Sequence, residues 1–191
     1  MQKVAVVISS RTEQYLNIAE CIRTVLSEFE AYVRVFVVES SDDLWMIQPG
    51  DFDGAMICSG ILAGNLPTWV VQWATLNADS LVQIPVALLA IHGADVWIDE
   101  AGLTKVFADR TGVHVELVGQ TAGADAKPKP KPIHQWFLHR RIGSKDRGPE
   151  LESAHVQTDW NRVKELASGI GMRIATSHVW HVYDLIVAED Q

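Results

Sequence analysis

Residues 3–20 read KVAVVISSRTEQYLNIAE, and they are the most informative residues for the fold. The run Val4–Ile8 is apolar and mostly β-branched, which is typical of a parallel strand covered on both faces. The hydroxyl-bearing residues Ser9, Ser10 and Thr12 follow, where the first amides of the next helix have no intrahelical partner. A strand, a polar turn and a helix in this order predict an α/β protein. The turn is either an anion site or only a helix cap.

The composition sets the class of protein. With 191 residues, 48% of them hydrophobic, the chain can bury one core, so we expect a single domain over residues 1–191. Two cysteines, Cys21 and Cys58, are too few for a disulfide framework and favour a reducing compartment. No apolar run reaches the roughly 20 residues that cross a bilayer, and the N-terminus enters a strand rather than a leader. We therefore expect a cytoplasmic protein.

Strand and helix patterns alternate along the chain. Helical spacing predicts a helix that ends near Glu30, followed by strands at 32–39, 52–58, 84–91 and 113–118. Further helices are predicted after Pro67, over about 99–110, and from Thr158 or Asp159 onward. The helix after Pro67 carries the apolar residues Trp69, Val70, Trp73, Ala74 and Leu76, of which the two tryptophans are expected on its inner face. The inner face predicted for the last helix comprises Trp160, Val163, Leu166, Ala167 and Ile170.

Five strands alternating with helices predict right-handed crossovers and a parallel sheet with helices on both faces, a three-layer α/β sandwich. We expect the strand order 2-1-3-4-5. Ligands of such sheets bind at the carboxyl ends of the strands, beside the point where the strand order reverses. The turns at residues 9–15, 59–65 and 92–97 should then meet there.

Two segments depart from this alternation. Residues 121–157 form an insertion too long for an ordinary connection, and it contains the extended motif KPKPKP. Between Lys127 and Arg147 it holds seven lysines and arginines against Asp146 alone, a net charge of +6, whereas the whole chain carries -8. The acidic total argues against nucleic-acid binding. The basic segment either packs on the domain or contacts an anionic membrane, which would place the protein at the inner membrane face.

The C-terminal residues 173–191 extend the domain. Their residue preferences slightly favour an edge strand at 177–187 over a short helix. An unpaired edge of this kind could join two copies in a homodimer.

Taken together, these motifs resemble the flavodoxin-like family, and more closely its menaquinone-dependent protoporphyrinogen dehydrogenase branch. The first loop of that branch is of the type S-T-R-x-G-x-T ahead of R-E-I-A, and SSRTEQYLNIA at residues 9–19 stands in its place. The basic aromatic insertion is similar too, and Gln157-Thr158-Asp159-Trp160 is similar to the family's Y-T-D-W helix opening. The similarity covers nearly all of the first 172 residues.

The resemblance implies that the chain binds FMN, with the phosphate in the first loop and the ring between the second and third loops. The cofactor-binding residues that it implies are Ser9, Ser10, Arg11, Thr12, Gln14, Tyr15, Ser59, Gly60, Ile61, Leu62, Ala63, Gly64, Asn65, His92, Gly93, Ala94, Asp95 and Trp97. Two departures weaken a phosphate site: Glu13 replaces the loop glycine, and Tyr15 replaces the closing threonine. Arg11 matches the family and compensates one charge.

Two functions stay open. In the first, the chain is an FMN-dependent oxidoreductase that passes electrons between a porphyrin, a quinone or a redox protein, without a catalytic side chain of its own. In the second, the phosphate loop is degenerate and the domain is a docking module that binds no flavin. No metal site is predicted, because pairs such as His178 and His181 lack completing ligands. Ser59 lacks the G-x-S-x-G setting of a hydrolase.

Overall fold

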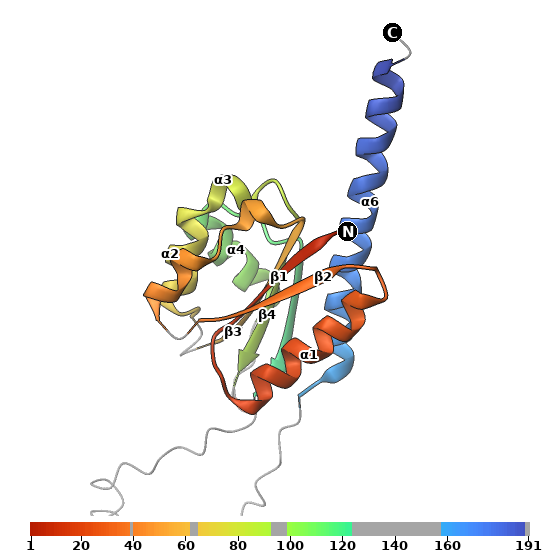
Figure 1. The fold of residues 1–191 in the computed structure, drawn as a ribbon. Helices are drawn as coiled ribbons and strands as arrows, with labels where there is room; N and C mark the ends of the chain where they lie inside the picture. Colours follow the sequence, from red (N-terminus) through yellow and green to blue (C-terminus); the bar gives the residue numbers. More distant parts are fainter. Residues whose placement is uncertain (39, 62–64, 93–98, 124–157, 190–191) are drawn as a thin grey trace, which may run out of the picture.

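A computed structural model describes residues 1–38, 40–61, 65–92, 99–123 and 158–189 (Figure 1). Five parallel strands form one sheet in the order β2-β1-β3-β4-β5, which confirms the predicted order. The strands are β1 (Lys3–Ile8), β2 (Tyr32–Val37), β3 (Gly54–Gly60), β4 (Val86–His92) and β5 (Leu117–Ala122). The helices are α1 (Glu13–Ser27), α2 (Thr68–Leu76), α3 (Ala78–Leu81), α4 (Glu100–Thr111) and α6 (Trp160–Glu189), and the 3-10 helices are η1 (Ser41–Met46) and η2 (Pro49–Asp51).

The sheet buries a separate apolar layer on each face. In β1, Val4, Val6 and Ile8 pack into the layer beneath α1 and α6, whereas Ala5 and Val7 pack into the layer beneath α2 and α4. Successive side chains of a strand point to opposite faces, so a strand covered on both sides must be apolar throughout. This accounts for the unbroken apolar run and confirms the three-layer arrangement.

The last helix lies close against the first. A Cβ atom added to Gly171 in α6 would lie 2.6 Å from Cδ2 of Phe29, so a glycine is needed at this contact. Val163 and Ile170 are fully buried on the same side of α6, as predicted. The close packing of α1 and α6 places the start of α6 beside the start of α1 (Figure 1).

The structure corrects two predicted elements. The fifth strand lies at Leu117–Ala122 rather than at 113–118, because Val113 and Val115 are buried ahead of the strand and mimic its alternation. The strand thus includes the first two positions assigned to the insertion. The predicted edge strand at 177–187 is wrong, since α6 continues to Glu189. Extending an existing helix gains one hydrogen bond per residue fixed, and this outweighs weak strand preferences.

One residue predicted on an inner helix face is exposed. Trp160 in α6 is 39% exposed, because it lies at the first position of the helix, where the apolar stripe runs past the sheet. Leu76, at the last position of α2, is 66% exposed. Within the described ranges, none of the helices is long and apolar enough to cross a membrane.

Candidate functional site

The first loop is joined to the end of β3 by side chains at the carboxyl edge of the sheet. The Gly60 amide donates to Ser9 Oγ at 3.2 Å, and the Ser9 amide donates to the Cys58 carbonyl at 3.2 Å. The Tyr15 side chain reaches back from α1 and forms a hydrogen bond with the Ser9 side chain. A Cβ atom at Gly60 would lie 2.9 Å from the Tyr15 hydroxyl, so any larger residue there would have to displace this hydroxyl. The first two predicted turns therefore meet.

Several polar groups at the start of α1 make no intrahelical hydrogen bond. The first intrahelical bond runs from the Leu16 amide to the Thr12 carbonyl at 3.1 Å, so the amides of residues 13–15 precede the ladder. Thr12 occupies the N-cap position, yet its hydroxyl makes no capping hydrogen bond. Ser10 Oγ instead accepts a bond from the Thr12 amide at 3.2 Å. The exposed Thr12 hydroxyl thus does not serve as a helix cap.

The charged and bulky residues of this loop point in different directions. Arg11 and Glu13 are both exposed, so the Glu13 carboxylate lies in solvent rather than inside the loop. Tyr15 is half-buried and packs against the apolar layer beneath α1 and α6. The tyrosine ring therefore fills space on the sheet side of the loop.

Gln14 connects the first loop to β5 and α6. Its Nε2 donates to the Ala122 carbonyl and to Thr158 Oγ1, both at 2.9 Å. The Gly123 amide donates to the His92 carbonyl at 2.6 Å, which connects β5 to the end of β4. Gly123 and Thr158, between which the chain leaves and rejoins the described domain, are thus held beside the first loop.

Burial shifts two ionisable groups at this edge. Burial raises the pKa of the Tyr15 phenol, and its hydrogen bond with Ser9 partly opposes the shift. Burial alone raises the pKa of the Cys58 thiol far above its ordinary value. Both groups are therefore neutral at physiological pH, and Cys58 is not a reactive thiolate.

Some of the remaining predicted site residues lie within the described residues, and the others lie outside them. Ser59 and Ile61 are buried at the end of β3, with the Ile61 amide donating to the Ile91 carbonyl at 2.8 Å, and Asn65 is exposed. His92 ends β4. The predicted ring-binding residues that lie outside the described residues are Leu62, Ala63, Gly64, Gly93, Ala94, Asp95 and Trp97.

Sequence reasoning missed the polar residues that close this edge. Thr121 Oγ1 accepts a bond from the Asp159 amide at 2.7 Å, and Thr158 accepts one from Gln14. Asp159, one of the two predicted caps, does cap α6 through bonds from the amides of Asn161 and Arg162 at 3.1 Å. Threonine at a strand end and ahead of a helix is too common to identify such a contact.

Solved structures share this fold. Rubredoxin oxygen:oxidoreductase from Desulfovibrio gigas aligns with a TM-score of 0.56 and 9% identity over 92% of this chain and 37% of its own. Reduced Megasphaera elsdenii flavodoxin aligns with a TM-score of 0.55 and 15% identity, covering 88% of this chain and 98% of its own. A flavodoxin from the domain Archaea aligns with a TM-score of 0.52 and 13% identity, covering 90% and 98%.

These likenesses show a flavodoxin-like fold. The chain spans a little over a third of the Desulfovibrio gigas protein and nearly the full length of the two flavodoxins. No protein-family profile matches the sequence, and no curated protein sequence does.

Proposed function

We propose that this chain binds FMN at the carboxyl edge of its sheet and acts as a redox protein. The observation that carries the proposal is the Thr12 hydroxyl, which stands at the start of α1 without capping it. Ser10 and Thr12 supply hydroxyls, and the first turn of α1 supplies amides and the positive end of the helix dipole, which together suit a phosphate. The exposed Arg11 adds a positive charge.

The two departures from the family motif leave room for this assignment. The exposed Glu13 side chain can stay in solvent, where water and salt screen its repulsion of an anion. Tyr15 points toward Ser9 and Gly60 and packs on the core, so its hydroxyl braces the loop against β3. Bound flavin would supply the hydride and electron chemistry, while the chain supplies the binding groups.

The finer part of the proposal concerns the reaction. We infer an oxidoreductase similar to protoporphyrinogen dehydrogenase, which takes electrons from a porphyrin and passes them to a quinone or a redox protein. The support is the position of Gly123 and Thr158, where the basic insertion leaves and rejoins the domain, beside Gln14 of the first loop. Positive charge near this edge would attract the carboxylates of a porphyrin or an anionic membrane.

Titration with FMN tests the proposal. Quenching of FMN fluorescence should be saturable, with a dissociation constant in the micromolar range or tighter, and the purified protein should be yellow. Ser10→Glu should abolish the binding, because it places a second negative charge against the phosphate. Ser177→Glu, an exposed change on α6, is the matched control and should leave the affinity unchanged. Protein that stays colourless in excess FMN would contradict the proposal.

A specific observation also favours the second function, a docking module without flavin. Gln14 and Tyr15 are both used in internal contacts rather than pointing into the loop. If the loop serves only to hold the fold together, Ser10→Glu should leave every binding property unchanged, and FMN should not raise the melting temperature. The same titration therefore separates the two functions.

A further inference from the structure

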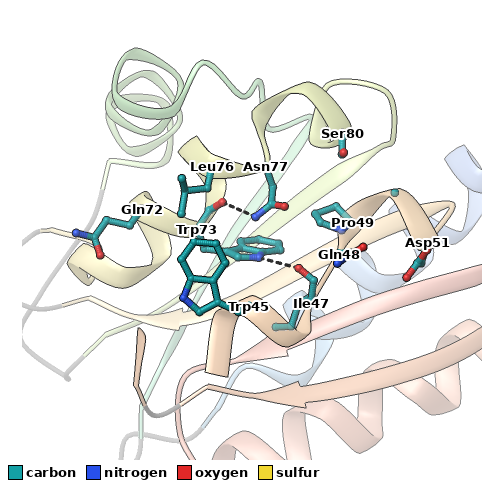
Figure 2. A pocket seen from close by; sticks show the side chains of 11 residues that line it. Trp45, Ile47, Gln48, Pro49, Asp51, Gln72, Trp73, Leu76, Asn77 and Ser80 are labelled. Atoms are coloured by element: carbon teal, nitrogen blue, oxygen red, sulfur yellow. Dashed lines mark hydrogen bonds between the residues drawn. The ribbon is translucent and has the colours of Figure 1, made fainter. Parts of the chain in front are cut away.

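A cavity lies far from the first loop. It has a volume of about 380 Å³ and opens between the 3-10 helices and helices α2 and α3 (Figure 2). Because η2 leads into β3 and α3 leads into β4, the cavity lies beside the amino ends of these strands, whereas the first loop follows a carboxyl end. Its volume is within the usual range of small-molecule sites.

The walls of this cavity are fixed by internal contacts. Trp73 is 1% exposed, and its Nε1 donates to the Ile47 carbonyl at 3.3 Å, which joins the two walls at the base. At one end the walls approach closely, since a Cβ atom on Gly50 would lie 3.7 Å from Ser80 Oγ. The cavity is therefore part of the folded architecture.

Apolar side chains stand exposed on its rim. Trp45 is 72% exposed and Leu76 is 66% exposed, although both line the cavity. Figure 2 shows the Trp45 ring beside the buried Trp73, with Leu76 on the facing helix. Exposed apolar groups around a concave site mark a surface that a ligand covers. The flat indole of Trp45 suits a planar apolar group.

The charge of the cavity determines which charge a planar ligand should carry. Among the residues that line it, Asp51 is the one ionisable side chain. Figure 2 shows Asp51 and Trp45 at opposite ends, with Ile47 between them. A carboxylate at one end attracts a cation and repels an anion. The ligand that fits carries its positive charge at the end away from its planar group.

We propose that this cavity binds an organic cation with a planar apolar body, an aromatic amine. Trp45 and Leu76 cover the ring, and Asp51 faces the ammonium group. Ser80, which lines the same cavity, offers a hydroxyl for a hydrogen bond. The cavity contains no residue of the proposed flavin site, so the two proposals can fail separately.

Three probes of one shape test the charge preference by isothermal titration calorimetry on the full chain. Tryptamine is a cation, tryptophol is neutral and indolepropionate is an anion. Tryptamine should bind saturably, tryptophol about threefold more weakly and indolepropionate about tenfold more weakly, as expected for one exposed carboxylate. Equal binding of all three probes, or no saturable binding of tryptamine, would overturn the proposal.

Two variants locate the binding in this cavity. Trp45→Ala should weaken tryptamine at least about tenfold, because the ring loses its apolar cover. Asp51→Asn should bring tryptamine and tryptophol to about equal affinity. Trp160→Ala and Asp109→Asn change the same residue types outside the cavity and should leave both affinities unchanged.

The same variants can also contradict the proposal. Unchanged tryptamine affinity in Trp45→Ala would overturn it. Trp45 and Asp51 are exposed, so both variants should fold, and their circular dichroism spectra and melting temperatures check this. FMN titration of the same samples reports the other site separately, so failure of one proposal is distinguishable from failure of the other.

Discussion

The two ends of the sheet differ in how their side chains are used. At the carboxyl edge, Gln14, Tyr15 and Ser9 bond to neighbouring elements and draw the first loop onto β3, β5 and α6. At the amino end, Trp73 is buried and bonded, whereas Trp45 beside it stays in solvent. One end is held together by polar contacts, and the other leaves apolar surface uncovered.

Side chains that make no internal hydrogen bond, rather than the bonded ones, therefore mark where a ligand can bind. At the carboxyl edge the open group is the Thr12 hydroxyl, and at the amino end it is the Trp45 indole. A hydroxyl suits an anion and an indole suits a planar apolar group. Substitutions of bonded side chains should therefore lower the free energy of unfolding, whereas substitutions of unbonded, exposed side chains should lower the affinity for a ligand.

The largest effect is expected for Trp73→Ala, which removes the base of the amino-end cavity. Loss of this buried side chain should lower the free energy of unfolding by about 3–5 kcal/mol in urea denaturation. Trp45→Ala is the matched control, because an exposed tryptophan should cost less than about 1 kcal/mol. Equal losses would show that exposure does not distinguish the two tryptophans.

Gln14→Leu should break the polar contacts at the carboxyl edge. It removes two hydrogen bonds and leaves the Ala122 carbonyl and the Thr158 hydroxyl without this donor, at an expected cost of about 1–3 kcal/mol. Urea denaturation measures the loss. Gln72→Leu, an exposed change on α2, should cost less than about 0.5 kcal/mol. If Gln14→Leu is equally harmless, these bonds do not stabilise the edge.

Thr12→Val separates a helix cap from a phosphate ligand. Because the hydroxyl makes no capping bond, the free energy of unfolding should change by less than about 0.5 kcal/mol. FMN affinity should fall about tenfold, which corresponds to about 1.4 kcal/mol. Thr24→Val, on the exposed face of α1, should change neither FMN affinity nor folding. A loss of stability with unchanged FMN affinity would identify Thr12 as only a cap.

The smallest effect is expected for Tyr15→Phe and depends on pH. Because burial raises the pKa of the phenol, the folded protein keeps its proton at a pH where the unfolded chain has lost it. Stability should therefore fall as pH rises above 10.0, the ordinary pKa of the phenol. Tyr15→Phe should make this fall shallower in urea denaturation between about pH 9 and 11.

The unmodified protein provides the reference for this pH effect. Cys58 contributes a loss of the same sign in both proteins, since burial raises the pKa of its thiol. Identical slopes in Tyr15→Phe and the unmodified protein would contradict the role given to Tyr15.

The fold was predictable because the sequence patterns that indicate it involve residues close together in the chain. Apolar runs such as Val4–Ile8 require cover on both faces, and their alternation with helices allows few topologies. Two predictions failed because packing or an adjacent element outweighed the local pattern. Val113 and Val115 are buried and alternate like strand residues but lie ahead of β5, and residues 177–187 form part of α6 rather than a strand. Local preferences are weak against packing and helix propagation.

The candidate sites were predictable only in part. The order of residues alone places hydroxyls after the first strand and ahead of a helix, because side-chain order is fixed by covalent order. The hydrogen bonds from Gln14 to β5 and α6, and the exposure of Trp45 beside Trp73, depend instead on the tertiary structure. Such contacts join residues far apart in the chain, and their geometry follows from how whole helices pack on the sheet.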